Sequence, residues 1–176
     1  DTSSSMEGEK LHAAKAAAVA FLDLVAASED RVALVAFDTA ARRECGLTRD
    51  FALLRSSVEA LATAPGTHID LGLAAALDEL QSSPAHAERT AVIVLLTDGR
   101  QDDESLVLDQ ADRARAAEVV IFAIGLGQDV DAEFLGRIAC SSAQTYLAPR
   151  PGDLAAIYER IAILYPCPPE LFWPLR

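Results

Sequence analysis

The stretch AVIVLLTDG at residues 91–99 decides the fold. Its first six residues are all apolar, so the strand that they predict is buried on both faces. A second run of this kind, VVIFAI, occupies residues 119–124, and a helical pattern lies between the two. Strands that are buried on both faces belong in parallel sheets covered by helices. The two runs therefore predict a central parallel pair with a helical crossover.

Helix and strand patterns alternate along the rest of the chain. Apolar residues at helical spacing predict helices over 7–28, 50–62, from 67 to about 80, 104–117, 131–139 and 152–164, and shorter runs predict strands at 31–37 and 144–148. The polar stretch DTAARRE at 38–44 predicts a tight return after the first of these strands. This order predicts an α/β fold: a doubly wound, Rossmann-like, mostly parallel sheet flanked by helices on both faces.

Length and charge narrow the classes of function. The 176 residues suit one domain, and 51% hydrophobic with 24% charged residues is a globular balance. The 15 basic and 27 acidic residues give a net charge of −12, which repels phosphate backbones and excludes general nucleic-acid binding. No apolar run approaches the roughly 18 residues of a membrane span, so we expect no direct insertion into a membrane.

We place the folded domain at residues 1–165 and a proline-rich C-terminal tail or linker at 166–176. Four prolines in the last twelve residues forbid a helix or a central strand there. Phe172 and Trp173 favour a tail that docks on the domain.

The three cysteines are Cys45, Cys140 and Cys167. Their odd number and wide spacing predict neither a disulfide framework nor a zinc site. Buried, inert thiols explain them, and a single Cys140–Cys167 bridge stays open.

Three groups of oxygen-bearing side chains fall where the sheet presents the carboxyl ends of its strands. Asp1, Ser3 and Ser5 precede the first helix, Thr67 begins the third, and Asp98 follows the first buried run. That edge is the usual ligand crevice of open α/β sheets. Alternate residues of an extended stretch share one side, so the first three side chains can act together.

Oxygen donors of this kind suit a hard divalent cation. Mg²⁺ takes about six oxygen ligands and usually keeps several waters among them. The carboxylates of Asp1 and Asp98 would roughly neutralise the ion, whereas the hydroxyls of Ser3, Ser5 and Thr67 add no charge. The ion would stay electrophilic, so a carboxylate of another protein could bind it. Taken singly, each residue also has a simpler interpretation as a turn or cap residue.

This set resembles the metal-ion-dependent adhesion site (MIDAS) of the von Willebrand factor type A (VWA) domain. The family has Asp-x-Ser-x-Ser after its first strand, a distant Thr, and a later Asp in a Thr-Asp-Gly turn. This chain has DTSSS at 1–5, GTHID at 66–70 and LLTDG at 95–99. The resemblance covers residues 1–164 and includes the IGLG turn at 124–127.

The resemblance implies a binding module for adhesion, assembly or scaffolding, and it does not imply catalysis. It implies Mg²⁺ or Mn²⁺ on the metal ligands Asp1, Ser3, Ser5, Thr67 and Asp98, some directly and some through water. The Asp or Glu carboxylate of a partner protein would complete the shell. High Ala and Arg usage with few lysines is typical of bacteria, and many bacterial relatives are extracytoplasmic or membrane-tethered. We therefore favour that location over the cytoplasm.

One part of the family pattern is missing. The family has an apolar central strand directly before the first Asp, and here that Asp is residue 1. We therefore expect the sequence to be a portion of a longer chain. Without that strand, we expect a hole in the sheet between unpaired strands. A true N-terminus at Asp1 would also place an α-ammonium group beside a metal ligand, which disfavours a cation.

His68, Asp102 and Asp103 are weaker candidates, as a rim that contacts the partner. His68 stands beside Thr67, and the two aspartates follow the Asp98 turn. An exposed histidine and an acidic first turn of a helix explain the same residues without a function.

Two other functions stay open. An open α/β sheet with carboxylates and Mg²⁺ at its carboxyl edge also describes phosphoryl-transfer enzymes. Such enzymes need a Lys or Arg that steadies the phosphate. Here the only lysines, Lys10 and Lys15, both fall on the first helix, and the second Asp of a DxDxT pattern is absent. The other alternative is a structural VWA domain that has lost its metal.

Overall fold

The computed structural model describes residues 1–26, 30–82, 90–99, 103–128, 130–139 and 141–164. The α-helices are α1 (Glu9–Val25), α2 (Phe51–Ala60), α3 (Ile69–Ser82), α4 (Glu104–Ala116), α5 (Ala132–Ile138) and α6 (Leu154–Leu164). The strands are β1 (Val32–Phe37), β2 (Ala41–Thr48), β3 (Val92–Thr97), β4 (Val120–Leu126) and β5 (Thr145–Ala148). Short 3₁₀ turns are η1 (Ser4–Met6), η3 (Ser142–Gln144) and η4 (Pro151–Asp153). The predicted tail at 166–176, Asp102, Cys140 and Cys167 lie outside the described residues.

Strands β3, β4 and β5 form a parallel sheet in that order. Val92 at the start of β3 pairs with Val120 of β4, and β4 is buried along its whole length. Because successive side chains of a strand point to opposite faces, β4 contributes to two cores. Ile121 and Ala123 pack into one core, and Val120 and Phe122 pack into the other. The two apolar runs therefore form the central parallel pair that the sequence predicts.

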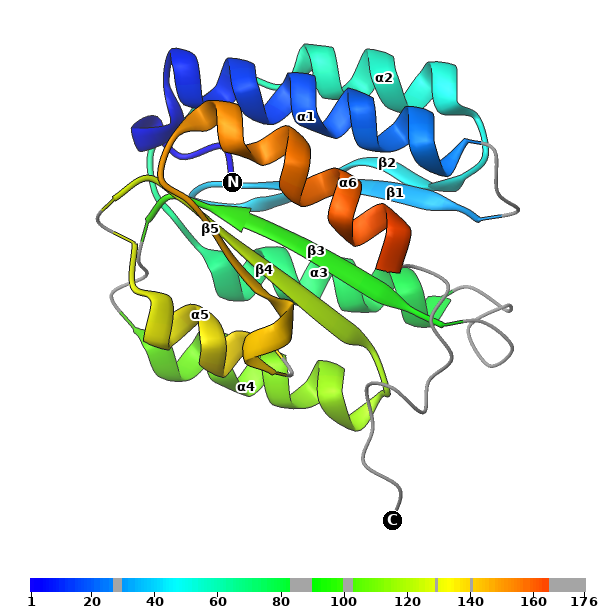
Figure 1. The fold of residues 1–176 in the computed structure, drawn as a ribbon. Helices are drawn as coiled ribbons and strands as arrows, with labels where there is room; N and C mark the ends of the chain where they lie inside the picture. Colours follow the sequence, from blue (N-terminus) through cyan, green and yellow to red (C-terminus); the bar gives the residue numbers. More distant parts are fainter. Residues whose placement is uncertain (27–29, 83–89, 100–102, 129, 140, 165–176) are drawn as a thin grey trace.

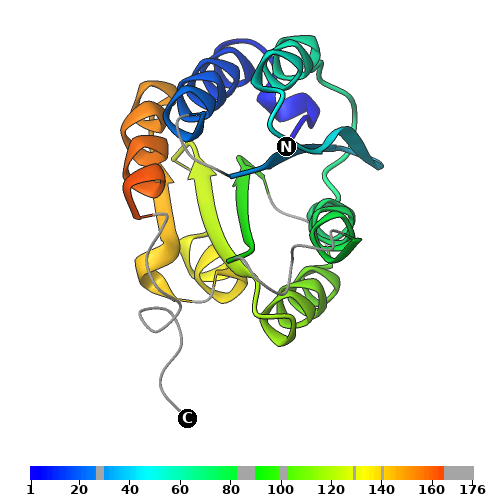
Figure 2. The ribbon, with the colours of Figure 1, turned by 90° about the vertical axis from the view of Figure 1, so that its right-hand side faces the viewer.

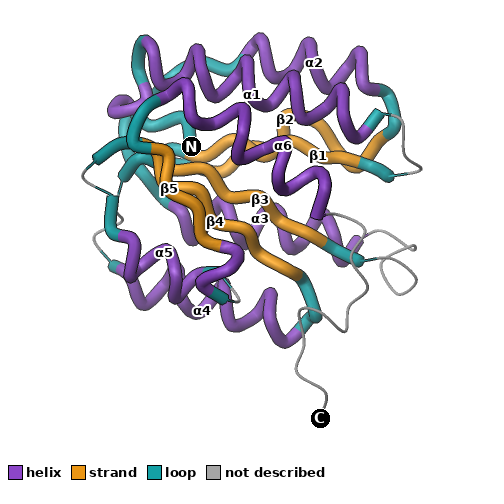
Figure 3. Tube along the Cα trace, in the orientation of Figure 1, coloured by secondary structure: helices purple, strands orange, loops and turns teal. Residues whose placement is uncertain are grey.

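Helices cover both sides of the strands. α1, α2 and α6 lie on one side, where α2 packs on β1 and β2, and α3, α4 and α5 lie on the other (Figure 1). The view turned by 90° shows the same two layers (Figure 2), and the strands run between them (Figure 3). α1 packs against both α2 and α6, and α3 packs against α4. The arrangement confirms the predicted doubly wound α/β class.

The stretch 38–44 is more than a tight return. Ala41–Thr48 form β2, which runs antiparallel to β1 with Ala41 opposite Phe37. The prediction of a return alone is wrong because β2 is an edge strand, and among its eight residues only Cys45 is buried. An edge strand with polar, exposed side chains lacks the alternation that marks a half-buried strand.

A cavity separates the two sheets. In the described part of the chain, the β1–β2 pair and the three-stranded sheet are not hydrogen-bonded to each other. A cavity of about 330 Å³ is lined by apolar residues of β1 and β3, among them Leu34, Ala36, Ile93 and Leu95. The hole that we expect between unpaired strands is therefore present.

Cys45 is the cysteine that lies within the described residues, and it is a free, buried thiol. Burial raises the pKa of this thiol, which keeps it protonated at neutral pH. This agrees with the interpretation of Cys45 as a small apolar residue.

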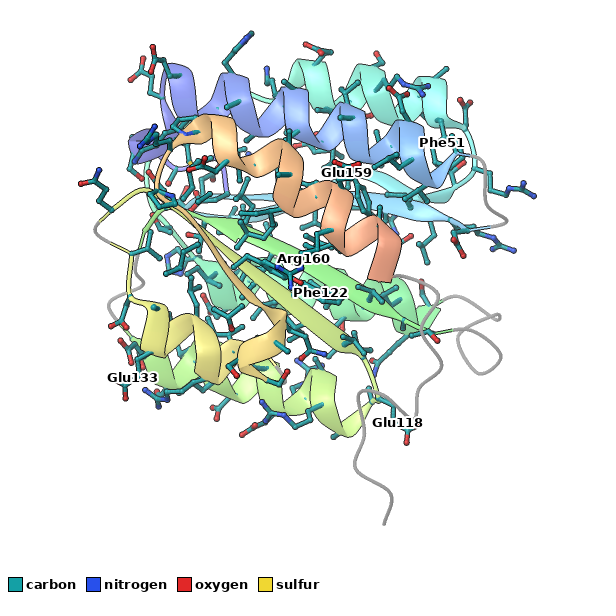
Figure 4. All side chains as sticks on the ribbon, in the orientation of Figure 1. Phe51, Glu118, Phe122, Glu133, Glu159 and Arg160 are labelled. Carbon is teal, nitrogen blue, oxygen red and sulfur yellow. The ribbon has the colours of Figure 1, made fainter. Side chains whose placement is uncertain are left out.

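Acidic side chains lie on the surface. Side chains such as Glu118, just before β4, and Glu133 of α5 are exposed and point outward (Figure 4). None of the helices in the described part of the chain has both the length and the apolar character to span a membrane.

Candidate functional site

The first two residues link the two sheets at the carboxyl ends of β1 and β3. The α-amino group of Asp1 donates a hydrogen bond to Leu96 O over 3.1 Å, and Thr2 N donates to Phe37 O over 2.8 Å. The Asp1 carboxylate turns toward the end of β3, where its Oδ2 accepts from Thr97 Oγ1 over 2.6 Å. Asp1 thus lies at the sheet edge where the sequence predicts it.

Asp1 also positions the serines that follow it. Its Oδ1 accepts a hydrogen bond from Ser3 N over 2.8 Å, which closes a local turn. The hydroxyl of buried Ser3 lies 2.9 Å from the hydroxyl of exposed Ser5. The three side chains are therefore close together, but not by the alternation of an extended stretch that the sequence predicts, because Ser5 lies in the 3₁₀ turn η1.

Asp98 joins this group from the far end of β3. Ser5 Oγ donates to Asp98 Oδ1 over 2.7 Å, and the ammonium group of Lys10 on α1 donates to Asp98 Oδ2. The Asp98 side chain is 0% exposed, so both of its oxygens are buried and paired. A buried carboxylate is costly unless it has partners, and these two contacts supply them.

Thr67 reaches the same place on the loop before α3. His68 N donates to Asp38 O over 2.8 Å, which fixes this loop to the end of β1. A Cβ added to Gly99 would lie 3.8 Å from Thr67 Oγ1. The Thr67 hydroxyl is therefore a close neighbour of the backbone that follows Asp98, which places Thr67 at the same edge as the other four predicted residues.

The five predicted side chains offer only oxygen atoms as ligands. Within the described residues, no three His, Cys, Asp or Glu side chains cluster as a metal-binding group. A cation at this edge would therefore rely on two carboxylates supported by hydroxyls. Hard cations such as Mg²⁺ and Mn²⁺ accept that donor set. The Asp98 carboxylate already pairs with a positive charge, the ammonium group of Lys10.

An ion pair between a buried carboxylate and a half-exposed arginine braces this edge, and sequence reasoning missed it. Asp38 is 1% exposed and accepts hydrogen bonds from Arg42 Nη1 over 3.0 Å and Arg42 Nη2 over 2.5 Å. The Thr2 hydroxyl donates to Asp38 Oδ2 over 3.2 Å. The Arg42 guanidinium holds the pKa of the Asp38 carboxyl well below its usual range. The position of Asp38 directly after a strand, like that of Asp98, is the signal that could have found it.

The predicted rim residues differ in their surroundings. His68 is exposed, and its Nδ1 lies 3.4 Å from Asp70 Oδ1. Asp103 caps α4, because its Oδ1 accepts from Ser105 N over 3.1 Å and from the Ser105 hydroxyl over 2.5 Å. The Ser105 hydroxyl also lowers the pKa of the Asp103 carboxyl. These contacts support the simpler interpretation of Asp103 as a cap. Asp102 is not described.

Comparison with known proteins gives one family. Residues 1–160 match the von Willebrand factor type A domain. An uncharacterised protein of Synechocystis sp. is 30% identical over 146 residues, which are 81% of this chain and 34% of the relative. This chain therefore spans about a third of the length of the curated relative that it matches.

Solved structures share the fold. The vWF domain of the type V pili tip protein Mfa5 from Porphyromonas gingivalis has a TM-score of 0.82 and 18% identity, over 93% of this chain and 91% of that one. A von Willebrand factor type A structure from Catenulispora acidiphila has a TM-score of 0.80 and 23% identity, over 92% of this chain and 40% of that one. Proximal thread matrix protein 1 from the mussel byssus, with a zinc-occupied MIDAS motif, has a TM-score of 0.80 and 23% identity, over 93% of this chain and 43% of that one. Since the family match covers residues 1–160 and these structures have the same fold, the chain belongs to the von Willebrand factor type A domain family.

Proposed function

We propose that this chain is a protein-binding module whose binding depends on a divalent cation. Mg²⁺ or Mn²⁺ would be held in a MIDAS by Asp1, Ser3, Ser5, Thr67 and Asp98, directly or through water. An Asp or Glu carboxylate of a partner protein would complete the coordination shell. Adhesion, assembly and scaffolding are the roles that fit such a module.

The hydrogen bond from Ser5 to Asp98 carries this proposal. It spans 2.7 Å between residues that are 93 positions apart, and the Ser3 hydroxyl lies 2.9 Å from the Ser5 hydroxyl. Turn and cap chemistry satisfies backbone groups within about three residues of the side chain. It therefore explains the contact between Asp1 and Ser3, but not the convergence of Ser5 and Asp98. A ligand bound by both side chains would explain that convergence.

The charges of the set suit a dication. Asp1 and Asp98 supply two negative charges, and the hydroxyls of Ser3, Ser5 and Thr67 supply none. When bound, such an ion supplies a Lewis acid that attracts a carboxylate of the partner. The protein residues hold and orient the ion at the sheet edge, and Asp38 with Arg42 braces the Thr67 loop next to it.

The relatives support a binding role. Mfa5 is a pilus tip protein, and proximal thread matrix protein 1 comes from the mussel byssus. The MIDAS of the mussel protein is occupied by zinc, so a divalent cation binds at that position in a protein of the same fold. Zinc prefers nitrogen and sulfur ligands, whereas the all-oxygen set of this chain favours Mg²⁺ or Mn²⁺.

Calorimetric titration with Mg²⁺ and with Mn²⁺ tests the cation site. We expect one ion per chain, with binding abolished in Asp98→Asn and unchanged in Asp112→Asn. The control removes the same charge from α4, where the Asp112 side chain is 71% exposed and pairs with Arg115. Binding that survives Asp98→Asn would place the ion elsewhere. No binding by the unaltered chain would favour the structural VWA domain without metal.

Selection from a displayed peptide library tests the partner. In Mg²⁺ we expect enrichment of peptides with an accessible Asp or Glu, and we expect EDTA to release them. The Asp98→Asn variant should enrich no such peptides. Equal enrichment in EDTA and in Mg²⁺ would refute the role of the cation in binding.

Hydrolysis of p-nitrophenyl phosphate tests the phosphoryl-transfer alternative. Lys10 pairs with Asp98, and Lys15 Nζ donates to Glu59 O over 2.8 Å, so both lysines of the sequence are engaged within the protein. The proposal expects no hydrolysis that depends on Mg²⁺. Hydrolysis that requires Mg²⁺ and disappears in Asp98→Asn would replace the binding module with an enzyme.

A further inference from the structure

Lys10 occupies an unfavourable position on its helix. It is in the first turn of α1 (Glu9–Val25), where the partial positive charge of a helix N-terminus disfavours a cation. Its ammonium group nevertheless contacts Asp98 Oδ2. Lys10 is thus unfavourable for the helix but pairs with Asp98, a predicted metal ligand, and this combination indicates a role at the site.

The two partners of this ion pair are unequally buried. The Asp98 side chain is 0% exposed, and the Lys10 side chain is 36% exposed. Ser5 gives the Asp98 carboxylate a neutral hydrogen bond, so the compensating positive charge comes from Lys10. Lysine carries its charge on a flexible four-carbon stem. Lys10 is therefore the partner that has room to leave.

We propose that Lys10 is an intramolecular competitor for the cation of the MIDAS. This inference rests on the proposed function. Without the ion, the Lys10 ammonium group neutralises the buried Asp98 carboxylate. With the ion, Lys10 releases Asp98 and turns to solvent. Lys10 thereby lowers the affinity of the site and sets the concentration of divalent cation that the module needs.

Lys10 and the cation would compete because both are positively charged and both would bind the Asp98 carboxylate. An ammonium group and a dication repel each other, and both would be drawn to the same carboxylate. Both oxygens of Asp98 already accept hydrogen bonds, one from Ser5 and one from Lys10. Binding of the ion therefore includes the loss of the Lys10–Asp98 ion pair, and that loss weakens the observed affinity.

Lys15 is a matched control on the same helix. Its Nζ donates to Glu59 O over 2.8 Å, where α1 packs against α2. Replacement of either lysine by methionine removes one positive charge and keeps a long, flexible side chain. A difference between the two variants therefore reports on the contact with Asp98 rather than on net charge.

Calorimetry with Mg²⁺ measures the competition. We expect Lys10→Met to bind Mg²⁺ about tenfold more tightly than the unaltered chain, the equivalent of ~1.4 kcal/mol. Lys10→Arg keeps a cation beside Asp98 and should bind like the unaltered chain, as should Lys15→Met. Equal affinities of Lys10→Met and Lys15→Met would refute the competitor role while leaving the proposed function intact.

Chemical acetylation followed by mass spectrometry tests the displacement in the unaltered chain, so it does not depend on the folding of a variant. On addition of Mg²⁺ in place of EDTA, the acetylation rate of Lys10 should rise several-fold while that of Lys15 stays constant. A Lys10 rate that does not respond to bound Mg²⁺ would overturn the displacement. If neither the unaltered chain nor Lys10→Met binds Mg²⁺, the proposed function fails and the competitor role fails with it.

Discussion

The Asp38–Arg42 ion pair beside the candidate site offers a quantitative test of the fold. Asp38 is 1% exposed, and Arg42 donates two hydrogen bonds to its carboxylate at 3.0 and 2.5 Å. The variant Arg42→Met keeps most of the aliphatic stem but leaves the buried carboxylate without its cation. Neutral donors remain close, among them the Thr2 hydroxyl and Ala40 N, each at 3.2 Å.

The expected loss of stability follows from the burial of each partner. Removal of one partner from a fully buried pair costs about 3–5 kcal/mol. The Arg42 side chain is 44% exposed. Because solvent screens part of the interaction, we expect Arg42→Met to lower the free energy of unfolding by about 2–3 kcal/mol at neutral pH.

The pH dependence of that loss has a definite sign. Arg42 lowers the pKa of Asp38 in the folded protein. The pair therefore stabilises the fold above the unfolded-state pKa of about 3.9, and this stabilisation is lost as the pH falls through the folded-state pKa. The difference between the unaltered chain and Arg42→Met should therefore narrow in acid.

Urea unfolding followed by circular dichroism, at neutral and at acidic pH, measures both effects. Arg115→Met is the control, because Arg115 pairs with Asp112, whose side chain is 71% exposed. Exposed pairs contribute about 0.2–1 kcal/mol. A loss in Arg42→Met no larger than that in the control, or a difference that widens in acid, would refute the reasoning.

Three further predictions concern the site, the packing and the cavity. Thr67→Ala should weaken Mg²⁺ binding about tenfold in calorimetry, which corresponds to ~1.4 kcal/mol, whereas Thr67→Ser should bind Mg²⁺ like the unaltered chain. Equal affinities of Thr67→Ala and the unaltered chain would remove Thr67 from the proposed ligands. Gly72→Ala should lower the free energy of unfolding by about 1–3 kcal/mol in urea titration, because the new Cβ would lie 2.6 Å from Phe37 Cδ1; an unchanged midpoint would show that Phe37 can move aside. Fusion of a six-residue apolar β-rich segment before Asp1 should fill the cavity of about 330 Å³. For a chain of this length, each ~1 kcal/mol of added stability raises the melting temperature by about 2–4 °C. A Gly/Ser segment of equal length should not raise the melting temperature. Equal melting temperatures of the two fusions would contradict the prediction.

Much of the architecture could be predicted from the sequence because it depends on local periodicity. The apolar runs at 91–96 and 119–124 predict buried parallel strands, and they form β3 and β4. The meeting of Asp1, Ser5 and Asp98 could also be predicted, since the carboxyl ends of parallel strands share one edge of a sheet. The bound cation stays a proposal, because its presence is a matter of affinity and not of pattern.

Other features depend on packing between distant segments. The edge strand β2 carries no clear alternation, because only one of its residues is buried. Lys10 and Asp98 are 88 positions apart, and their contact depends on how α1 packs over the end of β3. Asp38 is held by two segments that follow it in the sequence, because His68 N donates to its carbonyl and Arg42 to its carboxylate. Periodicity reports which face of an element is apolar, but only tertiary packing decides which polar groups share a buried, low-dielectric place.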